Sequence, residues 1–190
     1  MANGTLKVEN IQTSSGSGTI TLGQSGETVT IPTGTTVSGS MSNKPAFEAQ
    51  LSGVQSLTDD ATTKVTFQTK NFDTHNYYDN STNYRFTPLV AGKYLVYSNI
   101  NADPLANTQL QNSQLMIYKN GSEFRRHEQN FTGNYVRRCS NDITAVIDMN
   151  GTTDYLEMFV RINDTSGDPQ LNDLSGLACY FGAYKLIGVE

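Results

Sequence analysis

Hydrophobic and polar positions alternate along most of the chain beyond residue 45. A period of two is typical of β-strands that bury one face, and apolar residues at the helical spacing of three and four are missing. We therefore predict an all-β protein without a helix of useful length. The expected strands are 46–52, 64–69, 82–87, 92–100, 112–119, 123–130, 138–149, 154–163 and 177–187.

Two Asn-Gly pairs lie between alternating apolar runs. Asn120-Gly121 is at the centre of LMIYKNGSEFRR, and Asn150-Gly151 is at the centre of AVIDMNGTTDYLEMFV. Asn-Gly supplies the two residues with positive φ that a type I′ turn requires. Both pairs are therefore predicted to be the turns of tight β-hairpins.

Residues 84–98 predict two core strands joined by a tight corner. Pro88 cannot donate to a strand ladder and ends the first strand, whereas Gly92 permits the turn into the second. Many short strands separated by such turns indicate a sandwich, barrel or jelly roll. The residues expected to face one core are Tyr84, Phe86, Tyr94 and Val96.

The chain before residue 45 has a different composition. Thr, Ser and Gly make up most of residues 13–40, and all tyrosines and phenylalanines lie at or beyond Phe47. Such a segment buries too little apolar surface to become ordered alone. It is either a flexible linker or an arm of short strands (TITL, ETVTIP and TTVSG) that three copies wind together, and the apolar residues at spacing two favour the arm. The residues that would share its axis are Ile20, Leu22, Val29, Ile31 and Val37.

Charge and cysteine content exclude several classes of protein. The formal charge of −5 gives no general attraction to nucleic acid or anionic lipid. No apolar run is long enough to span a bilayer, and no secretory signal is expected at the N-terminus. Cys139 and Cys179 are too few for a disulfide framework. They could pair, but two small buried thiols are the preferred interpretation.

Four segments resemble the C1q/TNF-like head domain, namely AFEAQLSG (46–53), YYDNSTNYRFTPLVAGKYLVYSNI (77–100), LMIYKNG (115–121) and ACYFGAYKLIG (178–188). That family has an AFSA-type first strand, then YD-x-x-T-x-x-F-T-x-P-x-x-G-x-Y-x-F, an Asn-Gly turn and a closing F-x-G-x-x-L strand. The matching residues are Tyr78, Asp79, Thr82, Phe86, Thr87, Pro88, Gly92, Tyr94, Asn120, Gly121, Phe181, Gly182 and Leu186.

The resemblance implies a ten-strand jelly-roll β-sandwich over residues 45–190 that assembles as a homotrimer. Residues 1–44 lack the collagen-like Gly-X-Y stalk of the family and instead resemble the N-terminal shaft or adaptor segments of bacteriophage fibre proteins. Together the two resemblances favour a virion protein made in the cytoplasm of a bacterial host. Its arm, residues 1–44, would trimerise and attach the protein to other virion proteins.

Counting antiparallel strands predicts where each connection lies. The turns at 120–121 and 150–151 and the C-terminus are expected at one end of the sandwich. The longer connections 101–111, 131–137 and 164–176 are expected at the other end. If the leader enters beside the C-terminus, as the resemblance suggests, these loops point away from the anchor, and long loops on a rigid scaffold commonly carry binding sites.

The candidate receptor-binding residues lie in two of these loops. Tyr135, Arg137 and Arg138 place an aromatic ring beside two cations, which suits a sugar ring bearing an acidic group or phosphate. Salt bridges at the surface or between subunits are an equally good interpretation of the arginines.

Three acids form the second part of the candidate site. Asp164, Asp168 and Asp173 could hold Ca²⁺, but they lack the spacing and the Glu of an EF-hand loop, so solvated acids are preferred. His75 and His127 show no ligand pattern and are expected to be surface or hydrogen-bonded histidines. No metal and no other cofactor is predicted.

Three functions remain open. Motifs of serine hydrolases, zinc proteases and P-loop enzymes are missing, so an enzyme is not expected. The first hypothesis is a trimeric phage fibre or spike whose head contacts a glycan or protein of the host surface. The second is a capsid decoration (cement) protein of the same fold. The third is a free C1q-like lectin or small carbohydrate-active enzyme.

Overall fold

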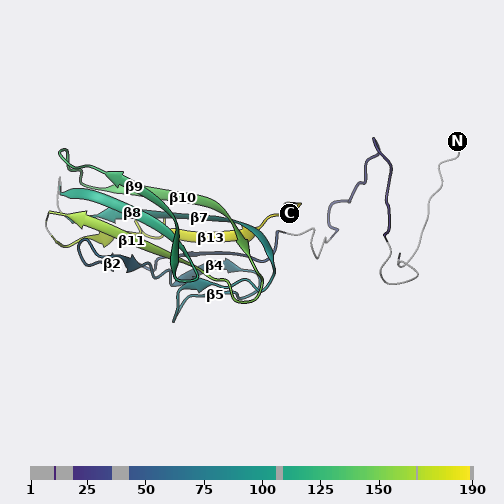
Figure 1. The fold of residues 1–190 in the computed structure, drawn as a ribbon, viewed down its shortest axis with the longest axis horizontal. Coiled ribbons are helices and arrows are strands. Elements are labelled where there is room, and N and C mark those ends of the chain that lie inside the picture. The colour runs from purple at the N-terminus through teal and green to yellow at the C-terminus, as the bar shows by residue number, and fades with distance from the viewer. Residues whose placement is uncertain (1–10, 12–18, 36–42, 106–108, 166, 189–190) are drawn as a thin grey trace. The chain divides into compact units, whose positions relative to one another are not determined.

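The computed structural model describes residue 11 and residues 19–35, 43–105, 109–165 and 167–188. The chain divides into two compact units, Met1–Val37 and Ser38–Glu190. The described residues contain thirteen strands, all in the second unit, and no helix (Figure 1). A helix long and apolar enough to cross a membrane is accordingly not found among them.

The second unit is a sandwich of two antiparallel sheets. Sheet A has the order β2 (Gln55–Ser56), β12 (Gln170–Leu171), β7 (Gly92–Asp103), β13 (Tyr180–Lys185), β1 (Ala46–Gln50) and β4 (Thr69–Asp73), with β10 (Cys139–Met149) also paired to β7. Sheet B has the order β5 (Tyr78–Asp79), β6 (Arg85–Phe86), β11 (Leu156–Asp164), β8 (Leu110–Lys119) and β9 (Ser122–Asn130), with β3 (Thr63–Lys64) also paired to β11.

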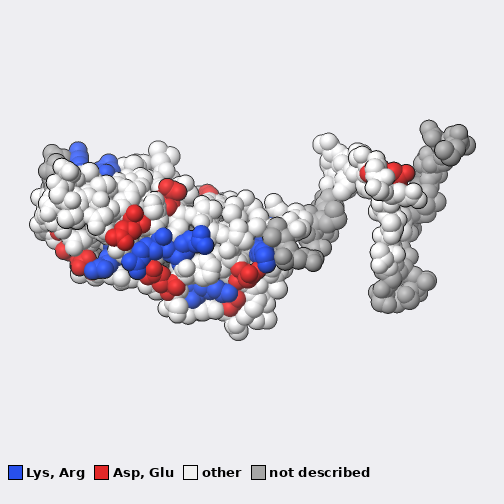
Figure 2. All heavy atoms as spheres, turned by 45° about the horizontal axis from the view of Figure 1, so that its top comes forward, with Lys and Arg blue, Asp and Glu red and all other residues white. Residues whose placement is uncertain are grey.

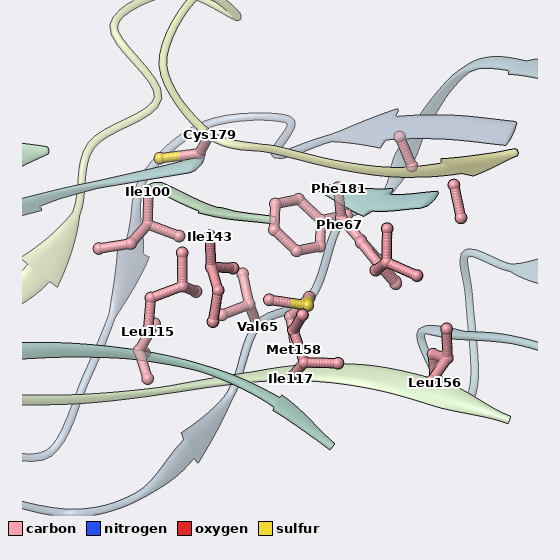
Figure 3. Packing of buried hydrophobic residues seen from close by; sticks show 14 of the residues in the cluster. Val65, Phe67, Ile100, Leu115, Ile117, Ile143, Leu156, Met158, Cys179 and Phe181 are labelled. Carbon is pink, nitrogen blue, oxygen red and sulfur yellow. The ribbon is translucent and has the colours of Figure 1, made fainter. Parts of the chain in front are cut away.

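The core fills the space between the sheets. Figure 3 shows Ile100 and Phe181 from sheet A meeting Leu115 and Met158 from sheet B. Aromatic rings concentrate around Phe47, which is fully buried and stacks on Tyr78 and Phe86 with ring centroids 4.7 and 4.4 Å away. Phe181 meets the Phe47 ring edge-on at 4.9 Å. Each such side chain contributes about 1.5–3 kcal/mol through burial, so this cluster anchors the first and last strands of the jelly roll.

The two Asn-Gly turns have different structures. Asn120 and Gly121 both have positive φ (53° and 77°) and join β8 to β9 as the predicted hairpin. The hairpin prediction at Asn150-Gly151 is wrong, because β10 pairs with β7 in sheet A and β11 pairs with β8 in sheet B. The segment 150–155 therefore crosses from one sheet to the other.

Two other expectations also needed correction. The strand expected at 64–69 is interrupted, since β3 ends at Lys64 and β4 begins at Thr69. Val65 and Phe67 are nevertheless fully buried, so their apolar alternation indicates burial without a regular ladder. Tyr84 does not join Phe86 in the core, because its φ of 51° turns the chain just before β6. Tyr94 and Val96 are buried as predicted.

Counting antiparallel strands predicted correctly at which end of the sandwich each connection lies. At one end, which we call the proximal end, β1 begins beside the end of β13, since Ala46 pairs with Tyr184. The Asn120-Gly121 turn contacts the 150–155 segment there, since the Asn120 N–H donates to the Tyr155 carbonyl (3.1 Å). The connections that follow β7, β9 and β11 lie at the opposite, distal end.

The first unit contributes no strand over residues 19–35 in this single chain. Its apolar side chains Ile20, Leu22, Val29 and Ile31 are all exposed, between 43 and 63 %. Val37 and part of TTVSG lie outside the described residues. Association of these residues among three copies therefore stays a prediction.

Candidate functional site

A single carboxylate ties the three distal connections together. Asp103, at the end of β7, is 3 % exposed. Its Oδ2 accepts hydrogen bonds from Arg138 Nη2 and from Asn172 Nδ2 (3.2 Å). Its Oδ1 accepts from the N–H of Leu105 (3.1 Å). The long loops on this end are therefore fixed to one another, and the sequence alone did not single out Asp103.

The Asp103 carboxylate stays ionised although it is buried. Burial acts to raise its pKa, but the hydrogen bonds from Arg138, Leu105 and Asn172 outweigh that effect, and the pKa is lowered. A buried acid that keeps its charge needs such partners. The ion pair with Arg138 is therefore part of the scaffold that holds the loops.

The ion pair between Arg138 and Asp103 gives Arg138 a different role from Tyr135 and Arg137, the other two candidate residues of the 131–138 loop. Arg138 uses Nη2 on Asp103, and its side chain is 32 % exposed. Arg137 and Tyr135 are exposed, Tyr135 by 38 %. Tyr135 and Arg137 are therefore accessible at the surface, whereas Arg138 positions the loop.

The three acids of the 164–176 loop also differ in role. Asp164 is 5 % exposed, and its Oδ1 accepts from the Gly167 N–H (2.6 Å). Asp173 is 8 % exposed and accepts from the N–H groups of Ser175 and Gly176. Only Asp168 is exposed. Within the described part of the chain, no group of three His, Cys, Asp or Glu side chains is arranged to hold a metal ion.

Exposed leucines at the distal end were not expected from the sequence. Leu174 and Ser175 both have left-handed φ (49° and 64°), a conformation that costs free energy for residues other than Gly. Hydrogen bonds from the loop backbone to the Asp173 carboxylate stabilise it. The result is a compact turn that leaves Leu177 81 % exposed. The sequence signal that could have indicated them is the pair of leucines within the polar stretch NDLSGLA.

A small cavity adjoins this surface. It has a volume of about 160 Å³, and it is lined by Leu57, Leu105, Asp168 and Pro169 together with neighbouring polar residues. Leu105 is itself 60 % exposed. The distal end therefore combines apolar tips with exposed charges that include Arg137 and Asp168.

The outer face of sheet A carries a second unusual surface. One row across β10, β7 and β13 places Val146, Leu95 and Tyr184 beside one another. Tyr97 lies in the next outward-facing row, and Tyr180 lies in the row after that. We call these five residues the tyrosine face. The Tyr97 and Tyr180 ring centroids are 6.2 Å apart. Tyr97 Oη donates to Glu48 Oε2 (2.9 Å), and burial together with this bond raises the pKa of Tyr97 well above its usual range.

Charges on the jelly-roll unit are mixed. Figure 2 shows Lys and Arg atoms beside Asp and Glu atoms on the face that it draws. Several form pairs, such as Arg161 with Asp60 at 2.9 Å. Such a surface lacks the extended single-sign field that attracts a polyanion. Binding on this face must therefore rely on local contacts.

The histidines and cysteines have ordinary structural surroundings. Nδ1 of His75 is bonded to Thr74 Oγ1 (2.9 Å), and Nδ1 of His127 is bonded to the Asp142 carbonyl (2.6 Å). Cys139 and Cys179 are both free thiols; Cys179 is buried, as preferred from the sequence, whereas Cys139 is only half-buried. Burial raises the pKa of Cys179 to about 11, which makes its thiol a poor nucleophile at neutral pH.

Comparison with known proteins identifies the fold. No family model matches the sequence, and no curated protein matches it significantly. Murine APRIL at pH 8.0 superposes with a TM-score of 0.54 and 16% identity, over 74% of this chain and 98% of that chain. The globular domain of zebrafish complement 1qA protein gives 0.53 and 14% identity, over 75% and 97%.

A third structure agrees with these two. Eiger TNF from S. frugiperda gives a TM-score of 0.51 and 15% identity, over 76% of this chain and 94% of that chain. At identities this low the likeness concerns the fold alone. The protein has a C1q/TNF-like jelly-roll β-sandwich, as its sequence resemblance predicted.

Proposed function

We propose that this protein is a homotrimeric fibre or spike component of a bacteriophage particle, with an N-terminal arm that attaches to the particle and a head that contacts the host surface. The observation that carries the proposal is that the entry of the chain and the long loops lie at opposite ends of the head. The chain enters β1 at the proximal end, and the three loops tied by Asp103 lie at the distal end. A head anchored proximally presents those loops outward.

The distal surface has the properties of a contact site. Exposed Tyr135, Leu174 and Leu177 stand on loops whose backbones are fixed by hydrogen bonds. Rigid loops lose little conformational entropy on binding, and exposed aromatic and apolar side chains are common anchors in interfaces. Arg137 adds an exposed cation on one of these loops, which can pair with an acidic group of a host glycan or protein.

The tyrosine face supports self-association. Tyr97, Tyr180 and Tyr184 present aromatic area on a regular sheet, where it is costly to leave in contact with water. Packing this face against other copies would remove that aromatic surface from water. Ile20, Leu22, Val29 and Ile31 would be buried in the same assembly, through the arm.

The test of host contact is a variant that changes the exposed side chains and leaves the scaffold intact. Particles carrying the triple substitution Tyr135→Ser, Leu174→Ser and Leu177→Ser should adsorb to host cells at least tenfold more slowly. The variant should sediment as the same trimer as the wild-type protein. Normal adsorption of these particles would contradict the proposal.

A capsid decoration protein predicts a different result. The same triple variant would then adsorb normally, whereas deletion of residues 1–44 would release the protein and make the capsids fragile. Locating the protein on the tail or the head of purified particles separates the two functions directly. A monomer at micromolar concentration, absent from particles, would exclude both and favour a free lectin. The proposal includes no catalytic activity.

A further inference from the structure

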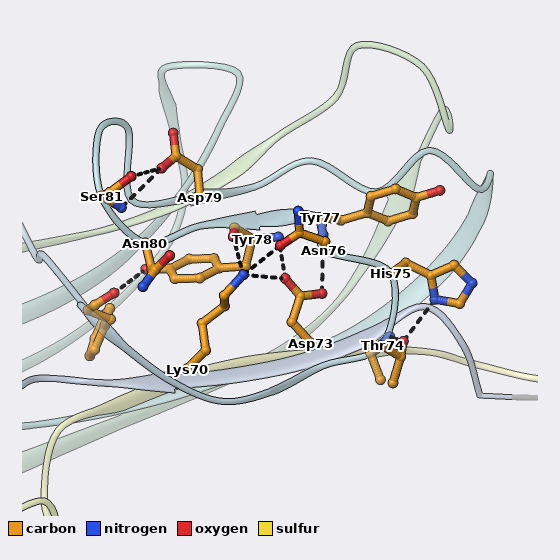
Figure 4. Close-up of polar contacts among 12 residues, drawn as sticks. Lys70, Asp73, Thr74, His75, Asn76, Tyr77, Tyr78, Asp79, Asn80 and Ser81 are labelled. Carbon is orange, nitrogen blue, oxygen red and sulfur yellow. Dashed lines mark hydrogen bonds and ion pairs between the residues drawn. The ribbon is translucent and has the colours of Figure 1, made fainter.

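The segment 70–89 lines an open polar cavity away from the distal loops. Its volume is about 460 Å³, within the range of pockets that hold small organic ligands. Its lining includes Lys70, Tyr77, Asn80 and Arg85. Figure 4 shows part of this lining, with Lys70 and Asp73 beside residues 76–78.

Two aspartates fix the walls of the cavity. Asp73 accepts hydrogen bonds from the N–H groups of Tyr77 and Tyr78 (3.1 and 3.0 Å). Asp79 accepts from the N–H groups of residues 81, 82 and 83, each at 3.0 Å. These bonds hold the pKa of Asp79 well below its ordinary value, so it stays charged. The cavity is formed before any ligand arrives.

Three asparagines of the lining each use one end of the amide on the protein. Asn76 Oδ1 accepts from Lys70 Nζ (2.7 Å), Asn80 Nδ2 donates to the Gln68 carbonyl (2.6 Å), and Asn83 Nδ2 donates to Asp79 Oδ2 (2.7 Å). The other end of each amide makes no hydrogen bond with the described residues. One NH₂ group and two carbonyl oxygens in fixed positions are therefore available to a ligand with several hydroxyl groups.

Arg85 provides the unpaired cation of this cavity. Its guanidinium lies over the ring of Tyr155, with Cζ 4.5 Å from the ring centroid. Among the described residues no carboxylate pairs with it, and no hydrogen bond involves it. Stacking uses the face of the guanidinium plane, so the N–H donors around its edge stay free for a bidentate partner. Lys70, by contrast, is bonded to Asp73 and Asn76.

We propose that this cavity binds an acidic sugar, a single hexose ring that carries a carboxylate. The carboxylate pairs with the edge of the Arg85 guanidinium. The free amide groups of Asn76, Asn80 and Asn83 bond the ring hydroxyls, and Tyr77 and Leu89 cover the apolar side of the ring. The site is independent of the distal loops, because all of its lining residues lie between Lys70 and Leu89.

The test is calorimetric titration of the full-length protein with D-glucuronate, D-glucose and D-glucose 6-phosphate. Glucuronate should bind saturably, and glucose at least tenfold more weakly. Arg85→Gln should weaken glucuronate binding about tenfold or more, because a charge-assisted hydrogen-bond pair is lost. Arg85→Lys should fall between the two, since it keeps the charge and loses the fork. Arg125→Gln, at an exposed arginine of β9, is the matched control and should bind like the wild-type protein.

Three outcomes would overturn the proposal. Equal affinity for glucuronate and glucose would remove the role of the carboxylate, and tighter binding of glucose 6-phosphate would assign the site to phosphate. Unchanged binding in Arg85→Gln, or no binding of any of the three sugars, would remove the site. Circular dichroism of the variants confirms that they are folded. Because the readout is sugar binding and not adsorption, its failure leaves the proposed fibre function untouched.

Discussion

The ring of Tyr97 lies directly across Gly182 on the outer face of sheet A. A Cβ at position 182 would fall 2.8 Å from Cε2 of that ring and closer still to Cζ. Tyr97 Oη then reaches Glu48 on the next strand but one, at 2.9 Å. The absence of a side chain at residue 182 is therefore what lets one tyrosine bridge β7, β13 and β1.

Gly182→Ala should displace the Tyr97 ring. We expect a loss of about 1–3 kcal/mol in the free energy of unfolding, as for overpacked sites, together with weaker self-association through the tyrosine face. Urea unfolding and sedimentation equilibrium measure the two effects. The double variant Tyr97→Ala, Gly182→Ala should be no less stable than Tyr97→Ala alone, because the clash is gone. A single Gly182→Ala variant that matches the wild-type protein in both assays would contradict this explanation.

The two Asn-Gly turns predict a matched pair of substitutions. Gly151→Ala places a Cβ 2.8 Å from the carbonyl carbon of Val90, and the nearest atoms are backbone that cannot move aside. Gly121→Ala meets only the Tyr155 hydroxyl at 3.4 Å. Both glycines have positive φ, so both variants carry about 1 kcal/mol of backbone strain. Gly151→Ala should therefore lower the urea midpoint clearly more than Gly121→Ala. Equal losses would show that the contact with residues 90–91 is unimportant.

Arg138→Ala should destabilise the head, although Arg138 lies in a candidate binding loop. Among the residues that the structure describes, its removal leaves the buried Asp103 carboxylate with only Asn172 and the Leu105 N–H as partners. Loss of one charged partner costs about 1–3 kcal/mol, measured by urea unfolding at neutral pH. Arg137→Ala is the control and should leave stability unchanged, since Arg137 is exposed. If both variants unfold like the wild-type protein, the Asp103 network does not hold the loops.

Asp79 predicts a pH dependence of stability. Its pKa is lowered chiefly by the N–H of Thr82, against the opposing effect of burial, with further hydrogen bonds from Ser81 and Asn83. A lowered pKa means that the stabilisation is fully present above the ordinary value of 3.8 and is lost as pH falls through the lower folded value. Asp79→Asn should therefore be less stable than the wild-type protein at neutral pH, and the difference should shrink in strong acid.

Thermal unfolding of the wild-type protein and of Asp79→Asn, from neutral pH to strong acid, measures the difference in stability. Asp168→Asn, at an exposed acid of the distal end, is the comparison and should behave like the wild-type protein throughout. A difference between Asp79→Asn and the wild-type protein that stays constant down to the lowest pH would contradict the assigned role of the carboxylate.

Features that depend on neighbouring residues were predictable. The Asn120-Gly121 hairpin followed from two adjacent residues whose φ values suit one turn, and both strands next to it lie in the same sheet. The same dipeptide at Asn150-Gly151 was misread, because the sequence does not say with which strand β10 pairs. Its Asn150 Oδ1 instead accepts from the N–H groups of residues 152, 153 and 154, which shapes a crossing between sheets.

The candidate sites, too, were predictable from the sequence only in part. The sequence placed the distal loops at one end, because strand parity depends only on counting. It did not show that Asp103 would join Arg138 to Asn172, since these residues are far apart in the chain and meet only when both sheets have formed. The cavity at 70–89 was likewise missed, because its asparagines and Asp79 appear in the sequence as ordinary turn residues.

By itself, then, the sequence determined the all-β class, the alternation that fills the core, the polar leader and the ends at which the loops lie. These depend on side-chain period and on turn residues, which act over a few positions. Only the tertiary structure decided which sheet each strand joins, which charges are paired within the head and which polar groups remain free at a surface. Those properties depend on contacts between distant segments, where packing and desolvation select one partner among many.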